Sequence, residues 1–263
     1  MTARPAAGGG RWVPVAPERL AGWISRFAER HGEVEAVLLP DVVRLDAADG
    51  AVAECHVPFP PLRPAPMAPS SPPREPVKPP PDDGRDDGAA GGGRGHAPDG
   101  PADDGQEGGF RLPPPAAALV AHVCRERTVG VLLARLGGHA AGVFTGARLV
   151  TGKAGSRQVH GRSAAGGWSQ QRFARRRDKQ SAEALRAAAD VAVGVLVPRL
   201  GELQAVVLGG DRRSIDEIRR DRRLAPVFAL ETGPFLTVPD PRLTVLEATP
   251  EQFRAVRIRL VDP

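Results

Sequence analysis

The pattern of apolar and polar residues in the first sixty positions predicts a small folded unit. A helix is expected from Pro17 to Gly32, because its apolar residues recur at helical spacing. Those residues are Leu20, Trp23, Ile24 and Phe27. Two or three short strands follow, with a turn at 48–50. We therefore predict a small N-terminal α/β unit at 11–58, preceded by a disordered tail at 1–10.

A second set of patterned segments begins after residue 115. Three successive strands are expected at 129–136, 140–145 and 149–160. Each is a short run of alternating or apolar residues, and Gly-Gly and Thr-Gly breaks separate them. A long helix is expected at 169–199 with Ser169 as its N-cap. The apolar run 205–210 is typical of a strand inside a parallel or mixed sheet, and a short polar helix and a last strand follow it. The fold class predicted is α/β (α+β), a mixed sheet with helices packed against it.

Between these segments the composition changes sharply. Residues 58–115 hold 17 of the 28 prolines, together with a Gly/Asp-rich run. Such a stretch buries too little apolar surface to offset the entropy lost on ordering. We therefore expect a disordered linker at 59–115 and a second domain at 116–263.

The composition excludes several classes of function. The two cysteines form no CxxC or zinc-ligand spacing, and the chain has no Walker, GxSxG or HExxH motif. The three expected strands from Val129 to His160 contain no Asp or Glu, so a metal-dependent nuclease is disfavoured and no metal or cofactor is expected. The absence of a secretion signal and of a long apolar run favours a cytoplasmic protein without a membrane contact.

The segment from His160 to Lys179 carries the most specific signal. The net charge is only +5, but five cations fall between Arg172 and Lys179, directly after a Gly-Gly pair and two glutamines. A glycine loop on a cationic helix is suited to entering a polyanionic cavity, because arginine binds phosphate through a planar fork. Taken singly, the Gly-Gly pair would indicate a hinge, and the run of arginines would indicate a solvent-exposed helix face.

This segment resembles the middle domain of archaeal and eukaryotic class I peptide-chain release factors. HGR, Gly-Gly, Ser and RFARRR match that family in order, and the resemblance extends over roughly 129–225. The residue directly after Gly-Gly is Trp168, where the release factors have glutamine. Gly167 and Gln170 instead have the Gly-x-x-Gln spacing of the Vms-type (VLRF1-type) branch of ribosome-quality-control peptidyl-tRNA hydrolases, which is the closer relative.

The resemblance implies an RNase H-like sheet without its metal site and a glycine-rich catalytic loop. It also implies hydrolysis of the peptidyl-tRNA ester, with a loop glutamine positioning water. The catalytic residues implied are Gly166, Gly167 and Gln170, with Gln171 as the alternative glutamine. Trp168 either stacks on a nucleobase or packs on its own domain. The residues expected to contact RNA are His160, Arg162, Trp168, Arg172, Arg175, Arg176, Arg177 and Lys179.

The function predicted is therefore release of nascent peptides from tRNA on stalled ribosomes or large subunits. The partners expected are peptidyl-tRNA and the peptidyl-transferase centre of the large subunit, and the protein is expected to be a monomer. The alternative is a non-catalytic ribosome- or RNA-binding factor with the same fold.

Overall fold

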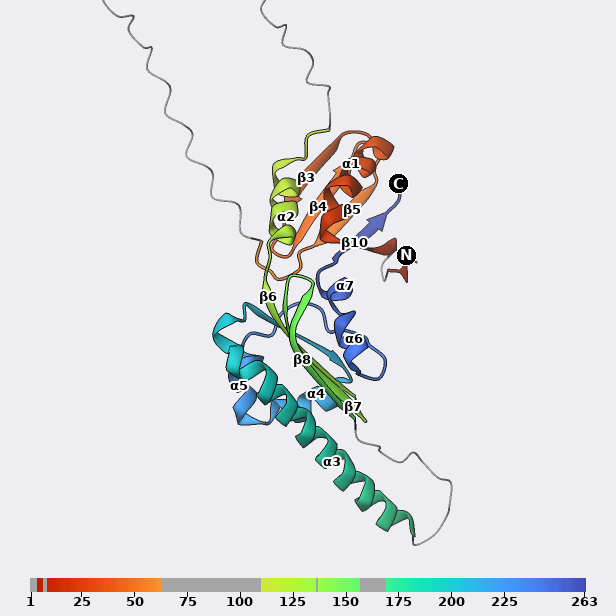
Figure 1. The fold of residues 1–263 in the computed structure, drawn as a ribbon. Coiled ribbons are helices and arrows are strands. Elements are labelled where there is room, and N and C mark those ends of the chain that lie inside the picture. Colours follow the sequence, from red (N-terminus) through yellow and green to blue (C-terminus); the bar gives the residue numbers. More distant parts are fainter. Residues whose placement is uncertain (1–3, 7–8, 63–109, 136, 157–168) are drawn as a thin grey trace, which may run out of the picture. The chain divides into compact units, whose positions relative to one another are not determined.

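The computed structural model describes residues 4–6, 9–62, 110–135, 137–156 and 169–263, with side chains of the last stretch from Lys179 onward. Its strands form two sheets, one of six strands and one of four (Figure 1). The mixed α/β class predicted from the sequence is confirmed. In the described stretches, no helix is long and apolar enough to cross a membrane.

The six-stranded sheet is antiparallel and has the order β1-β2-β10-β5-β4-β3. Its strands are β1 (Arg4–Pro5), β2 (Arg11–Val15), β10 (Val256–Val261), β5 (Val52–His56), β4 (Val42–Ala47) and β3 (Val34–Leu38). Alternate residues face one core, as the period of a strand requires. Thus Ala53 and Cys55 of β5 are buried beside Ile258 and Leu260 of β10.

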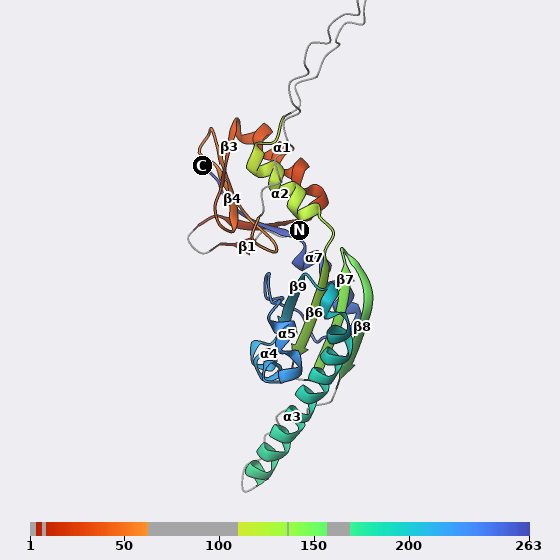
Figure 2. The same cartoon turned by 90° about the vertical axis from the view of Figure 1, so that its left-hand side faces the viewer.

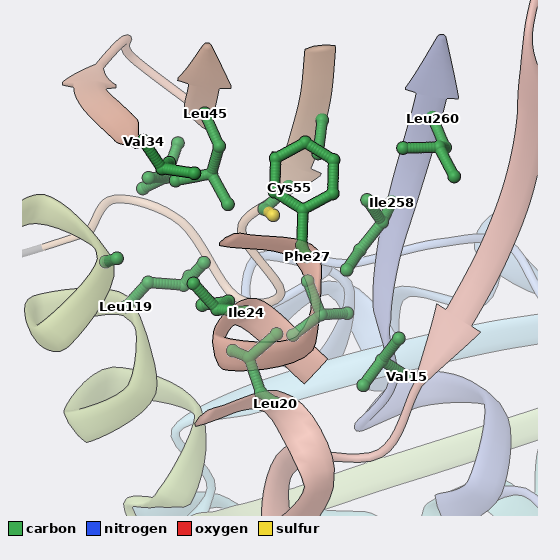
Figure 3. Packing of buried hydrophobic residues seen from close by; sticks show 14 of the residues in the cluster. Val15, Leu20, Ile24, Phe27, Val34, Leu45, Cys55, Leu119, Ile258 and Leu260 are labelled. Atoms are coloured by element: carbon green, nitrogen blue, oxygen red, sulfur yellow. The ribbon is translucent and has the colours of Figure 1, made fainter. Parts of the chain in front are cut away.

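Two helices cover this core. The helix α1 (Leu20–His31) contributes Leu20, Ile24 and Phe27, and α2 (Pro114–Cys124) contributes Leu119 (Figure 3). The expected helix at 17–32 is confirmed, with its first turn forming the 3₁₀ helix η1 (Pro17–Arg19). Gly32 ends α1 at a φ of 87°, a backbone conformation that glycine adopts without strain.

The last strand, β10, belongs to this sheet and not to the sheet in which the sequence pattern placed it. It pairs with β2 on one side and β5 on the other, so the chain returns to its first sheet at the end. The helix α2 joins the same core. The two ends of the chain therefore build one sheet together.

The described parts of the expected tail and linker also differ from the sequence prediction. Arg4 and Pro5 pair with Trp12 and Arg11, so these two residues form a strand. At the linker borders, Leu62 is buried in the core of the six-stranded sheet and Leu112 packs against it. The rest of the expected linker, residues 63–109, lies outside the described residues.

A buried histidine lies at the end of α2. The Nε2 atom of His122 lies 3.0 Å from the carbonyl oxygen of Pro58 and 3.0 Å from Nη2 of Arg127. The Pro58 carbonyl can only accept and the Arg127 guanidinium can only donate, so Nε2 donates to Pro58 when it carries the ring proton and accepts from Arg127 when it does not. Burial, and to a lesser degree the neighbouring Arg127 and Arg125 charges, lower the pKa of His122.

The four-stranded sheet has the order β8-β7-β6-β9. Its strands are β6 (Thr128–Arg135), β7 (Gly138–Thr145), β8 (Arg148–Ser156) and β9 (Ala205–Gly210). The first three form an antiparallel meander, and β9 lies parallel to β6. The strand predictions are confirmed, except that β8 ends at Ser156 and the expected positions 157–160 lie outside the described residues.

The outer edge of β9 is covered by the segment 230–236. Val206 N–H donates to the Leu230 carbonyl (2.8 Å) and Leu236 N–H donates to the Leu208 carbonyl (2.8 Å). Single parallel bridges join Val206 to Glu231 and Gly209 to Leu236. The strand is therefore flanked on both sides, as its fully apolar sequence indicates.

Helices pack on both faces of the four-stranded sheet. On one face lie α3 (Ser169–Leu196) and α4 (Arg212–Arg219), with the short elements η2 (Val197–Glu202), η3 (Arg222–Leu224) and α5 (Ala225–Phe228). On the other face lie α6 (Leu243–Glu247) and α7 (Pro250–Phe253). The strand residues divide by parity, since Leu132 faces α3 whereas Val131 and Leu133 face the α6 side. Figure 2 shows α3 running along the sheet and continuing past its end.

Candidate functional site

The residues predicted to carry the chemistry lie between β8 and the first turns of α3. His160, Arg162, Gly166, Gly167 and Trp168 lie outside the described residues. Their position in the fold is bounded by Ser156 at the end of β8 and Ser169 at the start of α3.

The two candidate glutamines belong to the helix. Because α3 begins at Ser169, Gln170 and Gln171 are the second and third residues of the helix. The backbone N–H groups of a first helical turn are unpaired within the helix and carry a partial positive charge. This end of α3 therefore favours anionic groups nearby.

The cationic positions follow on the same helix. The core-facing residues of α3 include Ala184, Ala188 and Ala192. With 3.6 residues per turn, positions 172, 176 and 179 fall on the opposite side of the helix. Lys179, the first of the helix's cations with a described side chain, is exposed, in agreement with this register.

The strand β8 ends at one definite edge of the sheet, at the residue before the segment 157–168. Ser156 pairs with Gly138, Gly138 pairs with Arg135, and Ala134 pairs with Gly210. The end of β8, the start of β7 and the carboxyl ends of β6 and β9 therefore lie in one row. We call this row, residues 134–135, 138–139, 155–156 and 209–211, the loop-proximal edge.

Close packing at this edge depends on glycine. A Cβ atom on Gly155 would lie 2.6 Å from Nε2 of His139, which is buried with 5% of its surface exposed. Gly210 has a φ of 101°, and a Cβ atom there would overlap the Ala134 carbonyl. Sequence reasoning did not single out His139, since a lone histidine at the start of a strand carries no pattern.

Polar groups at the loop-proximal edge hold the backbone. Nη1 of Arg135 donates to the Val238 carbonyl (2.8 Å), and Asp211 N–H donates to the Ala134 carbonyl (2.8 Å). The Asp211 carboxylate caps α4 by accepting from Ser214 N–H (3.2 Å) and Ser214 Oγ (2.9 Å). The carboxylate of Asp211 is therefore engaged in a structural role.

The side chains that remain exposed around this edge include several cations. They are Arg135, Lys153, Arg212 and Arg213, of which Arg212 lies over the Phe235 ring at 4.3 Å. Among the described residues no group of three His, Cys, Asp or Glu side chains could hold a metal ion. The described part of the edge thus offers positive charge, which suits a phosphate-bearing partner.

The second basic stretch of the sequence, residues 211–223, is different. Three of its arginines form ion pairs within the domain, namely Arg219 with Glu231 (2.6 Å), Arg220 with Glu217 (2.8 Å) and Arg223 with Asp190 (2.7 Å) and Asp221 (2.6 Å). Much of its positive charge is therefore neutralised locally.

Residues 127–259 match the family described as "Actinobacteria/chloroflexi VLRF1 release factor". This range includes the whole four-stranded sheet, α3 to α7 and the first part of β10. No curated protein is significantly similar to the chain in sequence.

Two solved structures are similar to part of the chain. One is the crystal structure of the archaeal translation termination factor aRF1, with 16% identity, a TM-score of 0.36, and coverage of 48% of this chain and 36% of that protein. The other is titled an archaeal protein, with 18% identity, a TM-score of 0.33, and coverage of 46% and 32%. The chain thus covers about a third of the length of each of these proteins.

Proposed function

The chain belongs to the actinobacterial and chloroflexi VLRF1 release factor family, and on this basis we propose that it releases nascent peptides by hydrolysing peptidyl-tRNA. The observation that carries the proposal is the family match over residues 127–259, which contains the predicted loop and α3. The substrate is the ester between the peptide and the terminal ribose of tRNA on stalled ribosomes or large subunits.

The proposed reaction needs only one positioned water molecule. The water oxygen attacks the ester carbonyl carbon, the bond to the ribose oxygen breaks, and the products are a peptide carboxylate and a free tRNA hydroxyl. Gln170 holds the water through its side-chain amide, with Gln171 as the alternative. Gly166 and Gly167 allow the backbone to approach the ester closely. Protons are handled by the tRNA ribose and ribosomal RNA, so the protein acts by positioning.

The start of α3 supports this assignment. The glutamines follow directly on the expected loop, and their backbone lies in the first turn of α3. Behind them, Arg172, Arg175, Arg176, Arg177 and Lys179 approach ribosomal RNA and tRNA phosphates. His160 and Arg162 contact phosphate on the other side of the loop, and Trp168 stacks on a nucleobase or packs on its own domain.

The order of strands supports an RNase H-like domain. Such a domain has an antiparallel three-stranded meander, a helical crossover and a fourth strand parallel to the first, and β6 to β9 follow this order. We propose a release-factor-like catalytic domain built on this sheet, and an N-terminal unit built on the six-stranded sheet. The protein is proposed to work as a monomer in the cytoplasm, where ribosomes translate.

The decisive experiment uses stalled ribosome–nascent-chain complexes. Release of the peptide from tRNA is followed by electrophoresis for the unaltered protein, Gln170→Ala, Gln171→Ala and the control Gln252→Ala, whose side chain is exposed in α7. We expect the loss of the water-positioning amide to slow release about a hundredfold or more, and the control to be fully active.

The outcomes separate the competing functions. Ribosome binding without release by the unaltered protein would replace the hydrolase with a non-catalytic ribosome-binding factor. RNA cleavage that depends on Mg²⁺ would indicate a nuclease. Full release by both glutamine variants would remove Gln170 and Gln171 from the mechanism.

A further inference from the structure

A cavity of about 160 Å³ lies between α1 and the strands β2 and β10 of the six-stranded sheet. Its walls include the aromatic side chains of Trp23 and Phe27 and the basic side chains of Arg11, Arg26, Arg30 and His31. Leu260 of β10 contributes to its floor, and Figure 3 shows this side chain beside Phe27. All of its lining residues belong to the six-stranded sheet and α1, and none of them is a residue assigned to release.

One wall of the cavity is a ladder of rings along α1. Trp23 and Phe27 are nearly parallel, with ring centroids 5.6 Å apart and an angle of 8° between the planes. Phe27 and His31 follow at 4.8 Å. The three rings recur every fourth residue and so lie on one side of the helix. Phe27 is almost completely buried, whereas Trp23 is partly exposed at the cavity.

The charges around the cavity are unbalanced. Arg11 is paired with Asp262 (2.9 Å) and His31 with Asp49 (2.8 Å). Neither Arg26 nor Arg30 forms an ion pair or a side-chain hydrogen bond with any residue that the structure describes. The lining contains no carboxylate.

The arrangement of Arg26 and Arg30 is unfavourable without a ligand. They are four residues apart on α1, where like charges destabilise a helix by a few tenths of a kcal/mol, and Arg11 lines the same cavity. An anion bound between these side chains would remove the repulsion. A guanidinium pair is suited to phosphate because each fork can donate two parallel hydrogen bonds.

The size and the aromatic wall restrict the anion further. The cavity is larger than the roughly 10–15 Å³ that one water needs and smaller than the roughly 300 Å³ typical of drug-sized ligands, so it would enclose only part of a nucleotide and leave the rest in solvent. Trp23 is partly exposed and lines the cavity, and stacking of a flat ring on an indole is independent of base identity. A carboxylate-bearing peptide would use the arginines but not the ring.

We propose that this cavity binds a nucleoside monophosphate, with the phosphate on Arg26 and Arg30 and the base against Trp23. The ligand is either a free nucleotide or the phosphorylated end of an RNA chain, which share this chemistry. The nucleotide site does not depend on the release reaction, so its test is independent of the proposed function.

The test is a calorimetric titration of the full-length protein with three probes. The probes are adenosine 5′-monophosphate, a short single-stranded RNA with a 5′-phosphate, and inorganic phosphate. We expect Arg26→Ala/Arg30→Ala to weaken binding about a hundredfold, or tenfold for each charge-assisted contact. Both side chains are exposed, so the variant keeps the fold, which circular dichroism checks. The matched control Arg125→Ala/Arg242→Ala removes two exposed arginines elsewhere and should bind normally.

Each result decides a part of the proposal. Binding of the free nucleotide, lost in Arg26→Ala/Arg30→Ala, supports a nucleotide site, and binding of the RNA alone with the same loss supports an RNA-end site. Quenching of tryptophan fluorescence on binding in a Trp12→Phe/Trp168→Phe background, in which Trp23 is the one remaining tryptophan of the sequence, supports contact with the indole. Inorganic phosphate binding as tightly as the nucleotide, equal binding by the double variant, or no binding of any probe would overturn the proposal.

Discussion

The C-terminal strand β10 should stabilise the N-terminal sheet strongly, and Ile258→Ala tests this. Ile258 has no exposed surface and lies between Val13 of β2 and Cys55 of β5. The substitution removes three buried carbon atoms, or about 2.4 kcal/mol at 0.8 kcal/mol each. A residual cavity of roughly 50 Å³ adds about 1.2 kcal/mol at 24 cal/mol per Å³. We expect the free energy of unfolding of this sheet to fall by about 3.5 kcal/mol.

The assay is denaturant unfolding followed by tryptophan fluorescence. In a Trp168→Phe background the remaining indoles, Trp12 and Trp23, both lie in the six-stranded sheet and its helix, so the signal reports this sheet. The control is Val261→Ala, at the partly exposed end of the same strand, which should cost much less. The reasoning is refuted if Ile258→Ala leaves the transition in place, since β10 would then contribute nothing to the N-terminal core.

Three other expectations follow from local contacts. Gly155→Ala should destabilise the four-stranded sheet by about 1–3 kcal/mol, because its new Cβ would lie 2.6 Å from His139 Nε2. In thermal unfolding, adding His139→Ala to this variant should recover part of the loss, and an unchanged melting temperature in Gly155→Ala would contradict the prediction. The folded-state pKa of His122 is lowered from 6.5, so the stability that neutral His122 contributes is complete above pH 6.5 and is lost as the pH falls below this value. In urea titrations, His122→Gln should therefore lose less stability than the unaltered protein between about pH 7 and pH 5. Burial raises the pKa of the Cys55 thiol to about 12, whereas Cys124 is exposed; mass spectrometry after iodoacetamide treatment should find Cys124 modified and Cys55 intact, and equal modification in the native state would contradict the burial.

The strands and the helix around the candidate site follow from local sequence. The strands β6 to β8 are separated by glycine-containing breaks, and β9 begins and ends where its apolar run does. The helix α3 begins at Ser169, where the sequence predicted its start, and the capping role of Ser169 stays a prediction. These features depend on hydrophobic period and on turn residues within a few positions, which a single sequence contains.

The site itself was predicted only in part. The sequence pointed to the Gly-Gly pair, the glutamines and the cationic helix, and the family match over 127–259 confirms the resemblance on which they rest. The particular roles of Gln170 and Gln171 stay predictions. His139, Asp211 and the covering of β9 by residues 230–236 were not predicted, because each depends on a partner distant in the sequence.

By itself, the sequence determined the period of each element, the family of the chain and the position of its cationic helix. Only the tertiary structure decided that β10 completes the N-terminal sheet and that α2 covers it. The alternation of Val256, Ile258 and Leu260 marks one buried face and would suit either sheet. The choice of sheet depends on which neighbouring strands offer matching apolar residues at each register, and those residues are about two hundred positions away.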